Sequence, residues 1–125
     1  MAEAAGNRPE IGVVIPVFNE ADNIEGLVSR LVPVLERVTQ SFEVVFVDDG
    51  SSDATMEMLR KVHASDKRLT AVSFSRNFGK EIAIAAGLDH TEADAVVIMD
   101  ADLQHPPEVI EAFVAKWREG YKNVY

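Results

Sequence analysis

The stretch VVIMDADLQHPPE, residues 96–108, contains an apolar run that ends in two carboxylates one residue apart. A short apolar run that is rich in β-branched residues and followed by a turn signal is typical of a strand in the centre of a parallel sheet. The run from Val96 to Met99 has this composition, so we expect Asp100 and Asp102 at the carboxyl end of a buried strand. Open α/β sheets bind ligands outside the carboxyl ends of their strands. The sequence therefore predicts a binding site at this aspartate pair.

Two carboxylates held this close repel each other unless a cation lies beside them. A hard divalent ion, Mg²⁺ or Mn²⁺, suits such a pair, because these ions prefer oxygen ligands and often share a site with substrate phosphates. The predicted metal ligands are Asp100, Asp102 and Gln104. The alternative is structural: the pair forms a polar strand end, and Asp102 caps the helix that begins near Pro106.

Apolar runs alternate with segments of helical periodicity along the chain. Apolar residues recur at helical spacing from Ile24 to Val38, with Pro33 expected to kink or split this helix. Asp53 is expected to cap the next helix, and Gly87 to allow a close approach to the one after it. This order predicts an α/β fold with a mostly parallel sheet, right-handed crossovers and helices on both faces. The expected strands are Ile11–Phe18, Phe42–Val47, Leu69–Phe74 and Ala95–Met99, and two further helices are expected over Lys80–His90, buried, and from Pro106 onward.

Length and composition fit one globular domain, since the 125 residues are 47% hydrophobic and 26% charged. The net charge of −9 opposes attraction to nucleic acid and to an anionic membrane surface. No apolar run approaches the roughly 20 residues that cross a bilayer, and the start has no signal-peptide pattern, so we expect a cytoplasmic chain. Residues 1–9 are expected to form a flexible tail, and residues 10–125 the folded part.

Polar residues also follow the first two predicted strands. Asn19 and Glu20 end the first, and Asp48, Asp49 and Gly50 end the second. Because the carboxyl ends of parallel strands meet at one edge of a sheet, we expect these residues to share a crevice with the aspartate pair. Asp49 can accept hydrogen bonds from a base amide or a ribose hydroxyl, which indicates a nucleotide ligand. The alternatives are an Asx turn of the aspartates with Gly50, and capping of the first helix by Asn19 and Glu20.

Two common phosphate-binding loops are absent. No GxGxxG motif follows the first strand, and the segment from Phe78 to Glu81 lacks the upstream glycine and the Ser or Thr of a P-loop. Dinucleotide redox chemistry and P-loop hydrolysis are therefore excluded. Arg76 and Lys80 are candidate phosphate contacts, and the alternative is that they form salt bridges with the acidic loops.

Two other α/β classes fit the aspartates less well. A phosphoacceptor receiver domain needs an acceptor aspartate after its third strand, where this chain has Ser75 and Arg76. A nucleotidyltransferase of similar fold needs a Gly-rich, basic loop after its first strand, which is not found here.

Four segments, VVIPVFNE (13–20), VDDGSSD (47–53), SRNFGKE (75–81) and DADLQHPPE (100–108), together resemble family 2 glycosyltransferases of the GT-A fold. The resemblance is greatest to the polyprenyl-phosphate hexosyltransferases. It implies a Rossmann-like nucleotide-binding half, and transfer of a hexose, with inversion, from a UDP- or GDP-sugar to a polyprenyl phosphate at the cytoplasmic face of a membrane. The residues that it assigns to the nucleotide sugar are Pro16, Asn19, Glu20, Asp49, Asp100, Ala101 and Asp102, and those that it assigns to the metal are Asp100, Asp102 and Gln104.

Members of this family continue beyond the matched segments with an acceptor-binding half. The resemblance therefore implies a donor-binding part that ends before that half, with the catalytic base outside this chain. We expect the isolated chain to bind donor weakly and to transfer nothing; the alternative is a non-catalytic nucleotide-sugar binding or assembly module. An unpaired sheet edge is expected near Tyr121–Tyr125, which predicts self-association.

Overall fold

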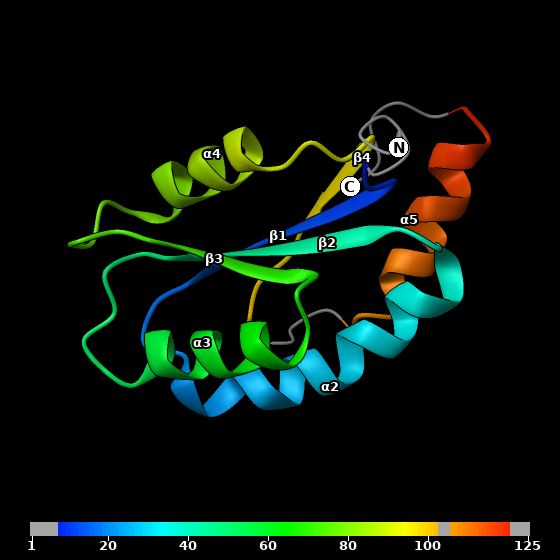
Figure 1. Ribbon diagram of the computed structural model, residues 1–125. Helices are drawn as coiled ribbons and strands as arrows, with labels where there is room; N and C mark the ends of the chain where they lie inside the picture. The colour runs from blue at the N-terminus through cyan, green and yellow to red at the C-terminus, as the bar shows by residue number, and fades with distance from the viewer. Residues whose placement is uncertain (1–7, 103–105, 121–125) are drawn as a thin grey trace.

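The structure is a computed structural model that describes residues 8–102 and 106–120. Four parallel strands form one sheet in these residues, in the order β3-β2-β1-β4 (Figure 1). This arrangement confirms the predicted α/β class and the parallel sheet. The strands are β1 (Ile11–Val17), β2 (Phe42–Asp48), β3 (Leu69–Ser73) and β4 (Ala95–Ile98).

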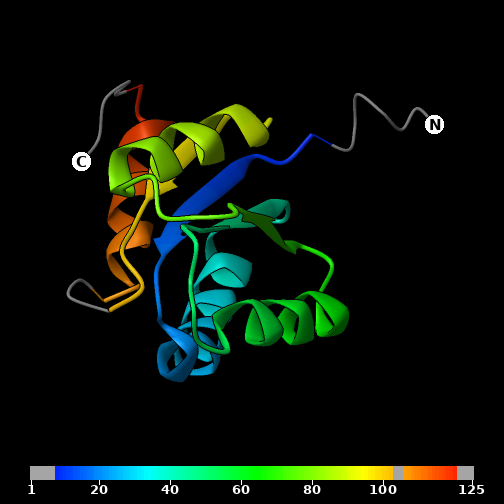
Figure 2. The same cartoon turned by 90° about the vertical axis from the view of Figure 1, so that its left-hand side faces the viewer.

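Helices cover both faces of the sheet, as predicted. In two perpendicular views, α4 lies across the sheet from α2 and α3 (Figures 1 and 2). The side chains of β1 alternate between the layers: Val13 and Ile15 pack in the core under α2 and α5, whereas Val14 faces α4. The helices are α2 (Ala21–Val38), α3 (Thr55–Ser65), α4 (Lys80–His90) and α5 (Val109–Arg118).

Helix α2 is continuous through Pro33, so the expectation that this proline splits the helix was wrong. Pro33 is exposed, while its neighbours Val34 and Leu35 are buried against the sheet. The apolar contacts of this helical face stabilise it enough to offset the single backbone hydrogen bond that proline cannot donate.

Strand β4 does not lie in the centre of the sheet, contrary to the prediction. Among the described residues it pairs only with β1, and Ile98 is 46% exposed. An apolar run indicates that the two faces of a strand are largely covered. It does not indicate whether the strand has a hydrogen-bonded neighbour on each side. Strand β4 also stops opposite Val14, so β1 runs on past it. The following segment, with Asp100, therefore lies beside the carboxyl-terminal part of β1.

Helix α4 is less buried than expected. Ala83 and Gly87 face the sheet, but Ile82 and Leu88 are exposed. The predicted close approach at Gly87 is confirmed, because a Cβ atom there would lie 2.4 Å from Cγ1 of Val14. Small residues thus let α4 pack tightly on β1.

Helix α5 begins at Val109 rather than at the prolines, whose carbonyl oxygens accept hydrogen bonds from the first helical N–H groups. Ile110 and Val114 are buried on α5, while Phe113 and Trp117 are half-buried. None of the helices in the described part of the chain combines the length and the apolar character that a membrane span requires.

Candidate functional site

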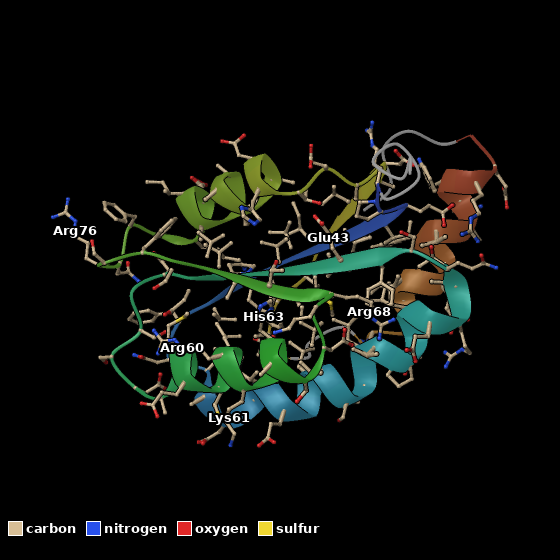
Figure 3. All side chains as sticks on the ribbon, viewed as in Figure 1. Glu43, Arg60, Lys61, His63, Arg68 and Arg76 are labelled. Carbon is tan, nitrogen blue, oxygen red and sulfur yellow. The ribbon has the colours of Figure 1, made fainter. Side chains whose placement is uncertain are left out.

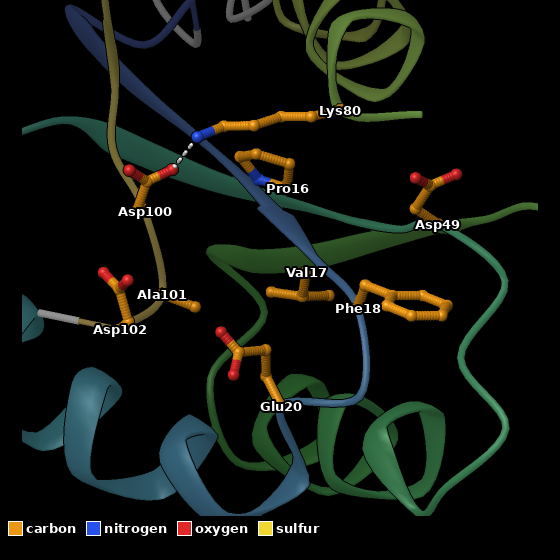
Figure 4. Close-up of a pocket in the computed structure, with 9 residues that line it drawn as sticks. All are labelled: Pro16, Val17, Phe18, Glu20, Asp49, Lys80, Asp100, Ala101 and Asp102. Carbon is orange, nitrogen blue, oxygen red and sulfur yellow. Dashed lines mark ion pairs between the residues drawn. The ribbon is translucent and has the colours of Figure 1, made fainter. Parts of the chain in front are cut away.

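A pocket of about 330 Å³ opens at the carboxyl ends of β1, β2 and β4 (Figure 4). This is the edge at which the sequence predicts a ligand, and seven of the predicted site residues come together there. Asn19 and Arg76 do not line the pocket, and Gln104 lies outside the described residues. The lining residues are Pro16, Val17, Phe18, Glu20, Asp49, Lys80, Asp100, Ala101 and Asp102.

An ion pair crosses this pocket. Lys80, the first residue of α4, places its Nζ 2.6 Å from Oδ1 of Asp100, which follows β4 (Figure 4). The side chains of Lys80 and Asp100 are 60% and 38% exposed, so the pair is open to solvent. The salt bridge proposed as the alternative for Lys80 is therefore formed. It joins α4 to the acidic segment after β4.

The acidic segment is fixed by Ala101, which is buried between the two aspartates. Asp100 and Asp102 both line the pocket on either side of this anchor. In the residues that the structure describes, no three His, Cys, Asp or Glu side chains form a group that could hold a metal. Two carboxylates nevertheless fit a hard divalent ion that takes its other ligands from phosphate or water. Asp100 already attracts a cation, the ammonium of Lys80.

Asp49 is buried, with 4% of its surface exposed, and both of its carboxylate oxygens are engaged. Oδ1 accepts a hydrogen bond from the N–H of Phe78 at 2.8 Å, and Oδ2 accepts one from the N–H of Gly79 at 3.1 Å. These are the two residues directly before Lys80. Asp49 thus fixes the start of α4, and with it the origin of the lysine side chain.

Gly50 brings the same two loops into contact. Its φ is +78°, and a Cβ atom there would lie 2.3 Å from the carbonyl carbon of Arg76. Only glycine fits such a close approach of two backbones. The neighbouring Asp48 closes this loop differently from the Asx turn considered as an alternative, because its Oδ1 accepts a hydrogen bond from the N–H of Ser51, three residues on, at 3.0 Å. The side chain of Asp49 takes no part in this turn and binds the loop before α4.

Asn19 links loops and does not face the pocket. Its φ is +54°, and its Oδ1 accepts hydrogen bonds from the N–H groups of Ser52 at 2.9 Å and Asp53 at 3.3 Å. The alternative, that Asn19 and Glu20 cap α2, holds only for position: Glu20 is the N-cap residue but makes no capping hydrogen bond with its side chain. Asn19 instead connects the loop after β1 to the loop after β2.

The start of α3 is tied to the start of α2 through Asp53. Its carboxylate accepts hydrogen bonds from the N–H of Thr55 at 2.9 Å and from the N–H of Ala21 at 3.3 Å. Ala54 occupies the N-cap position, one residue later than expected, although Asp53 still satisfies a first-turn N–H group. The hydrogen bond from the Thr55 hydroxyl, above all, holds the pKa of Asp53 below its ordinary value.

Arg76 packs on an aromatic ring outside the pocket. Its guanidinium lies 4.8 Å from the centre of the Phe78 ring, which in turn meets Phe74 edge to face at 5.5 Å. Figure 3 shows Arg76 at the outer tip of the loop before α4, pointing away from the molecule. Of the two candidate phosphate contacts, only Lys80 reaches the pocket.

Val17 and Phe18 line the pocket without having been predicted. Phe18 is 47% exposed, which is unusual for a large aromatic residue directly after a buried strand. The sequence signal was the aromatic residue between an apolar run and the polar Asn19. Its ring offers an exposed apolar surface in a pocket that also contains four carboxylates.

The sequence from residue 12 to residue 125 matches the family described as glycosyl transferase family 2. It is 44% identical to the bactoprenol glucosyl transferase of Shigella phage SfX, over 89% of this chain and 36% of that protein. It is 38% identical to the undecaprenyl-phosphate 4-deoxy-4-formamido-L-arabinose transferase of Salmonella choleraesuis, over 92% of this chain and 36% of that protein. The chain thus spans just over a third of the curated relatives that it matches.

Among solved structures, the fold is similar to that of the mannosyltransferase PcManGT from Pyrobaculum calidifontis in complex with GDP-Man and Mn²⁺. The TM-score is 0.67 at 33% identity, over 76% of this chain and 28% of that one. The similarity confirms the expected fold, that of the GT-A glycosyltransferases. With a family match that covers nearly all of its residues and polyprenyl-phosphate transferases among its relatives, the chain belongs to glycosyl transferase family 2.

Proposed function

We propose that this chain is the donor-binding part of an inverting glycosyltransferase that moves a hexose from a nucleotide-diphosphate sugar to a polyprenyl phosphate at the cytoplasmic face of a membrane. The observation that carries the proposal is the pocket at the carboxyl ends of the strands, which Asp100 and Asp102 line and in which Asp100 pairs with Lys80. The relatives named for bactoprenol and undecaprenyl phosphate support the class of acceptor.

A nucleotide diphosphate complements this pocket. Asp100 and Asp102, with Gln104, would hold a divalent ion, and Lys80 supplies a further positive charge for phosphate. The ion would neutralise the diphosphate that leaves when the bond to the sugar breaks. The solved relative with GDP-Man and Mn²⁺ supports this combination of ligands.

The nucleoside is assigned to the side of the pocket away from the acidic pair. Figure 4 places Asp49 there, beyond Phe18. Each carboxylate oxygen of Asp49 accepts one backbone hydrogen bond and has a second lone pair, with which it can accept a bond from a base or a ribose. The exposed ring of Phe18 and the apolar surface of Pro16 suit the face of a base. Both uracil and guanine fit this chemistry.

Donor binding is tested by calorimetric titration of the chain with UDP-glucose and GDP-mannose in the presence of Mn²⁺. We expect saturable binding of one of them, and a loss of at least about tenfold in affinity in Asp102→Asn, because a charged ligand-binding oxygen is removed. Asp89→Asn, at an exposed position on α4, is the matched control and should bind like the parent chain. Equal binding by the parent chain and Asp102→Asn contradicts the proposed site.

Transfer is expected to need residues beyond these. A polyprenyl phosphate acceptor is largely ionised near neutral pH, so the attack needs little help from a base, but it must be held in line with the sugar. The isolated chain should therefore bind donor and transfer nothing. Labelled sugar passing from the donor into an extracted polyprenyl-phosphate fraction would contradict this expectation.

A further inference from the structure

Lys80 stands out among the described residues that line the pocket, because it is the only cation among them. It occupies the first position of α4, where the positive end of the helix dipole disfavours a cation. An anionic partner offsets this cost, and Asp100 is that partner, 2.6 Å away. The placement of Lys80 thus indicates that this lysine is held at the site by charge.

The origin of the lysine side chain is fixed by the backbone, whereas its ammonium is held only by the ion pair with Asp100. Asp49 binds the N–H groups of Phe78 and Gly79, which anchors the backbone just before Lys80. The side chain itself is 60% exposed on a flexible four-carbon stem. Figure 4 shows it extended past Pro16 to Asp100, along the edge of the pocket.

We propose that Lys80 is an exchangeable counter-ion for the acidic pair. Its ammonium binds Asp100 when no divalent ion is present, leaves that carboxylate when an ion arrives, and then binds the phosphates of the nucleotide. This inference deepens the proposed function and rests on it.

The exchange follows from the charges. A carboxylate oxygen 2.6 Å from an ammonium is already occupied by a cation, and a divalent ion on the same oxygen would lie within a few ångströms of a like charge. Repulsion therefore favours departure of the ammonium from Oδ1 when the ion binds there. A nucleotide diphosphate brings new negative charge into the pocket, and the anchored side chain can rotate toward it. The same lysine should thus oppose binding of the metal alone and favour binding of the nucleotide.

These opposite effects are measurable on the 125-residue chain with Lys80→Met, which keeps the length of the stem and removes the charge. For Mn²⁺ alone, counted by electron paramagnetic resonance of the free ion, we expect the variant to bind about two- to fivefold more tightly, the range set by the loss of an exposed ion pair. For UDP and GDP at saturating Mn²⁺, calorimetry should show binding about tenfold weaker or more, because a charge-assisted contact to phosphate is lost.

Lys61→Met is the control for charge. Lys61 lies on α3, across the sheet from α4, and its loss removes the same single charge from the chain (Figure 3). It should change neither affinity. Lys80→Arg, which restores the charge, should move both affinities back toward the parent values.

The results separate this inference from the proposed function. Nucleotide binding by the parent chain with both affinities unchanged in Lys80→Met, or with both changed in the same direction, overturns the exchange and leaves the donor site standing. Failure of Mn²⁺ with UDP or GDP to bind the parent chain and the variant alike overturns both. Far-UV circular dichroism checks that each variant is folded.

Discussion

At the scale of the residue, Asp49 acts on the site through the backbone that it holds. It is buried, and its two oxygens bind the N–H groups that precede Lys80. A single carboxylate thereby fixes the backbone from which the side chain of Lys80 extends into the pocket. It also faces the pocket, so binding and positioning depend on one side chain.

Asp49→Ala should lower the free energy of unfolding by about 2–4 kcal/mol, because it removes two hydrogen bonds to a charged acceptor and leaves two N–H groups unpaired. Asp49→Asn keeps one acceptor oxygen and should cost less. Urea unfolding followed by circular dichroism measures both. Equal stability of the parent chain and Asp49→Ala would show that the loop before α4 is held by other contacts.

The sequence predicts the positions of site residues better than their partners. Asp100 and Asp102 could be placed from an apolar run followed by acids, because a strand end is a local pattern. The contacts of Asn19 and Arg76 could not be predicted. Their partners depend on how the loops pack against one another, and a local sequence pattern does not encode that packing. Asn19 links two loops, and Arg76 stacks on Phe78.

At the scale of the element, the starts of α2 and α3 are joined by a short relay of hydrogen bonds. The N–H of Glu20 donates to Oγ1 of Thr55 at 2.9 Å, and the Thr55 hydroxyl donates to Oδ1 of Asp53 at 2.5 Å. The carboxylate also accepts from Ala21. This relay fixes the two helices that follow the strand ends of the pocket.

The relay predicts a dependence on acid. The pKa of Asp53 is lowered in the folded chain, chiefly by the Thr55 hydroxyl, so its contribution to stability is complete above the unfolded pKa near 4. That contribution is lost as the pH falls through the lower folded pKa. Thr55→Val should raise the pKa of Asp53 toward its ordinary value, measured by NMR titration of the carboxyl carbon. An unchanged titration midpoint would contradict the assignment of the hydroxyl as the cause.

Replacement by alanine should have opposite effects on stability at two helical glycines, because only Gly87 is packed against the sheet. Gly87→Ala would place a Cβ atom 2.4 Å from Val14 and 3.2 Å from Val47, so it should destabilise the chain by about 1–3 kcal/mol through overpacking. Gly26→Ala on α2 meets nothing within 4 Å and should stabilise the chain by about 0.5–1 kcal/mol. Urea unfolding of both variants is the measurement, and a stabilised Gly87→Ala would contradict the packing.

At the scale of the whole molecule, large apolar side chains remain exposed on α4 and on β4. Ile82 and Leu88 of α4 and Ile98 of the edge strand β4 are each more than 40% exposed. The predicted edge near Tyr121–Tyr125 lies outside the described residues, but β4 is itself an open edge in the described sheet. An open apolar edge is a site for pairing between chains.

We therefore expect the chain to self-associate as its concentration rises. Ile98→Lys should reduce this association, since a charge at an edge strand opposes pairing. Ile82→Lys makes the same change of charge on α4, away from the sheet edge, and should have a smaller effect. Light scattering over a range of concentrations measures all three proteins. A parent chain that stays monomeric throughout would contradict the expectation.

Alternation of strand and helix patterns predicted the α/β class and the two-sided covering of the sheet, because periodicity reports which faces are buried. Strand order was not accessible in this way. The two central positions are occupied by β2 and β1. Both strands are mostly apolar, as β4 is, so the sequence pattern alone does not distinguish central strands from an edge strand. Only the pairing between distant segments makes that distinction. The expectation that Pro33 splits α2 was wrong for a similar reason, since the packing of this helix on the sheet outweighs a local preference.

The central claim is that the acidic pair and Asp49 form a metal-dependent nucleotide site. It is tested most directly by thermal unfolding of the chain with UDP, GDP, ADP, UDP-glucose and GDP-mannose, each with and without Mn²⁺. A ligand at 100 times its dissociation constant adds about 2.7 kcal/mol of stability, which shifts the midpoint of a chain of this size by several degrees. We predict such a shift with uridine or guanosine nucleotides, only when Mn²⁺ is present. A cooperatively unfolding sample with no shift for any of them would contradict the account.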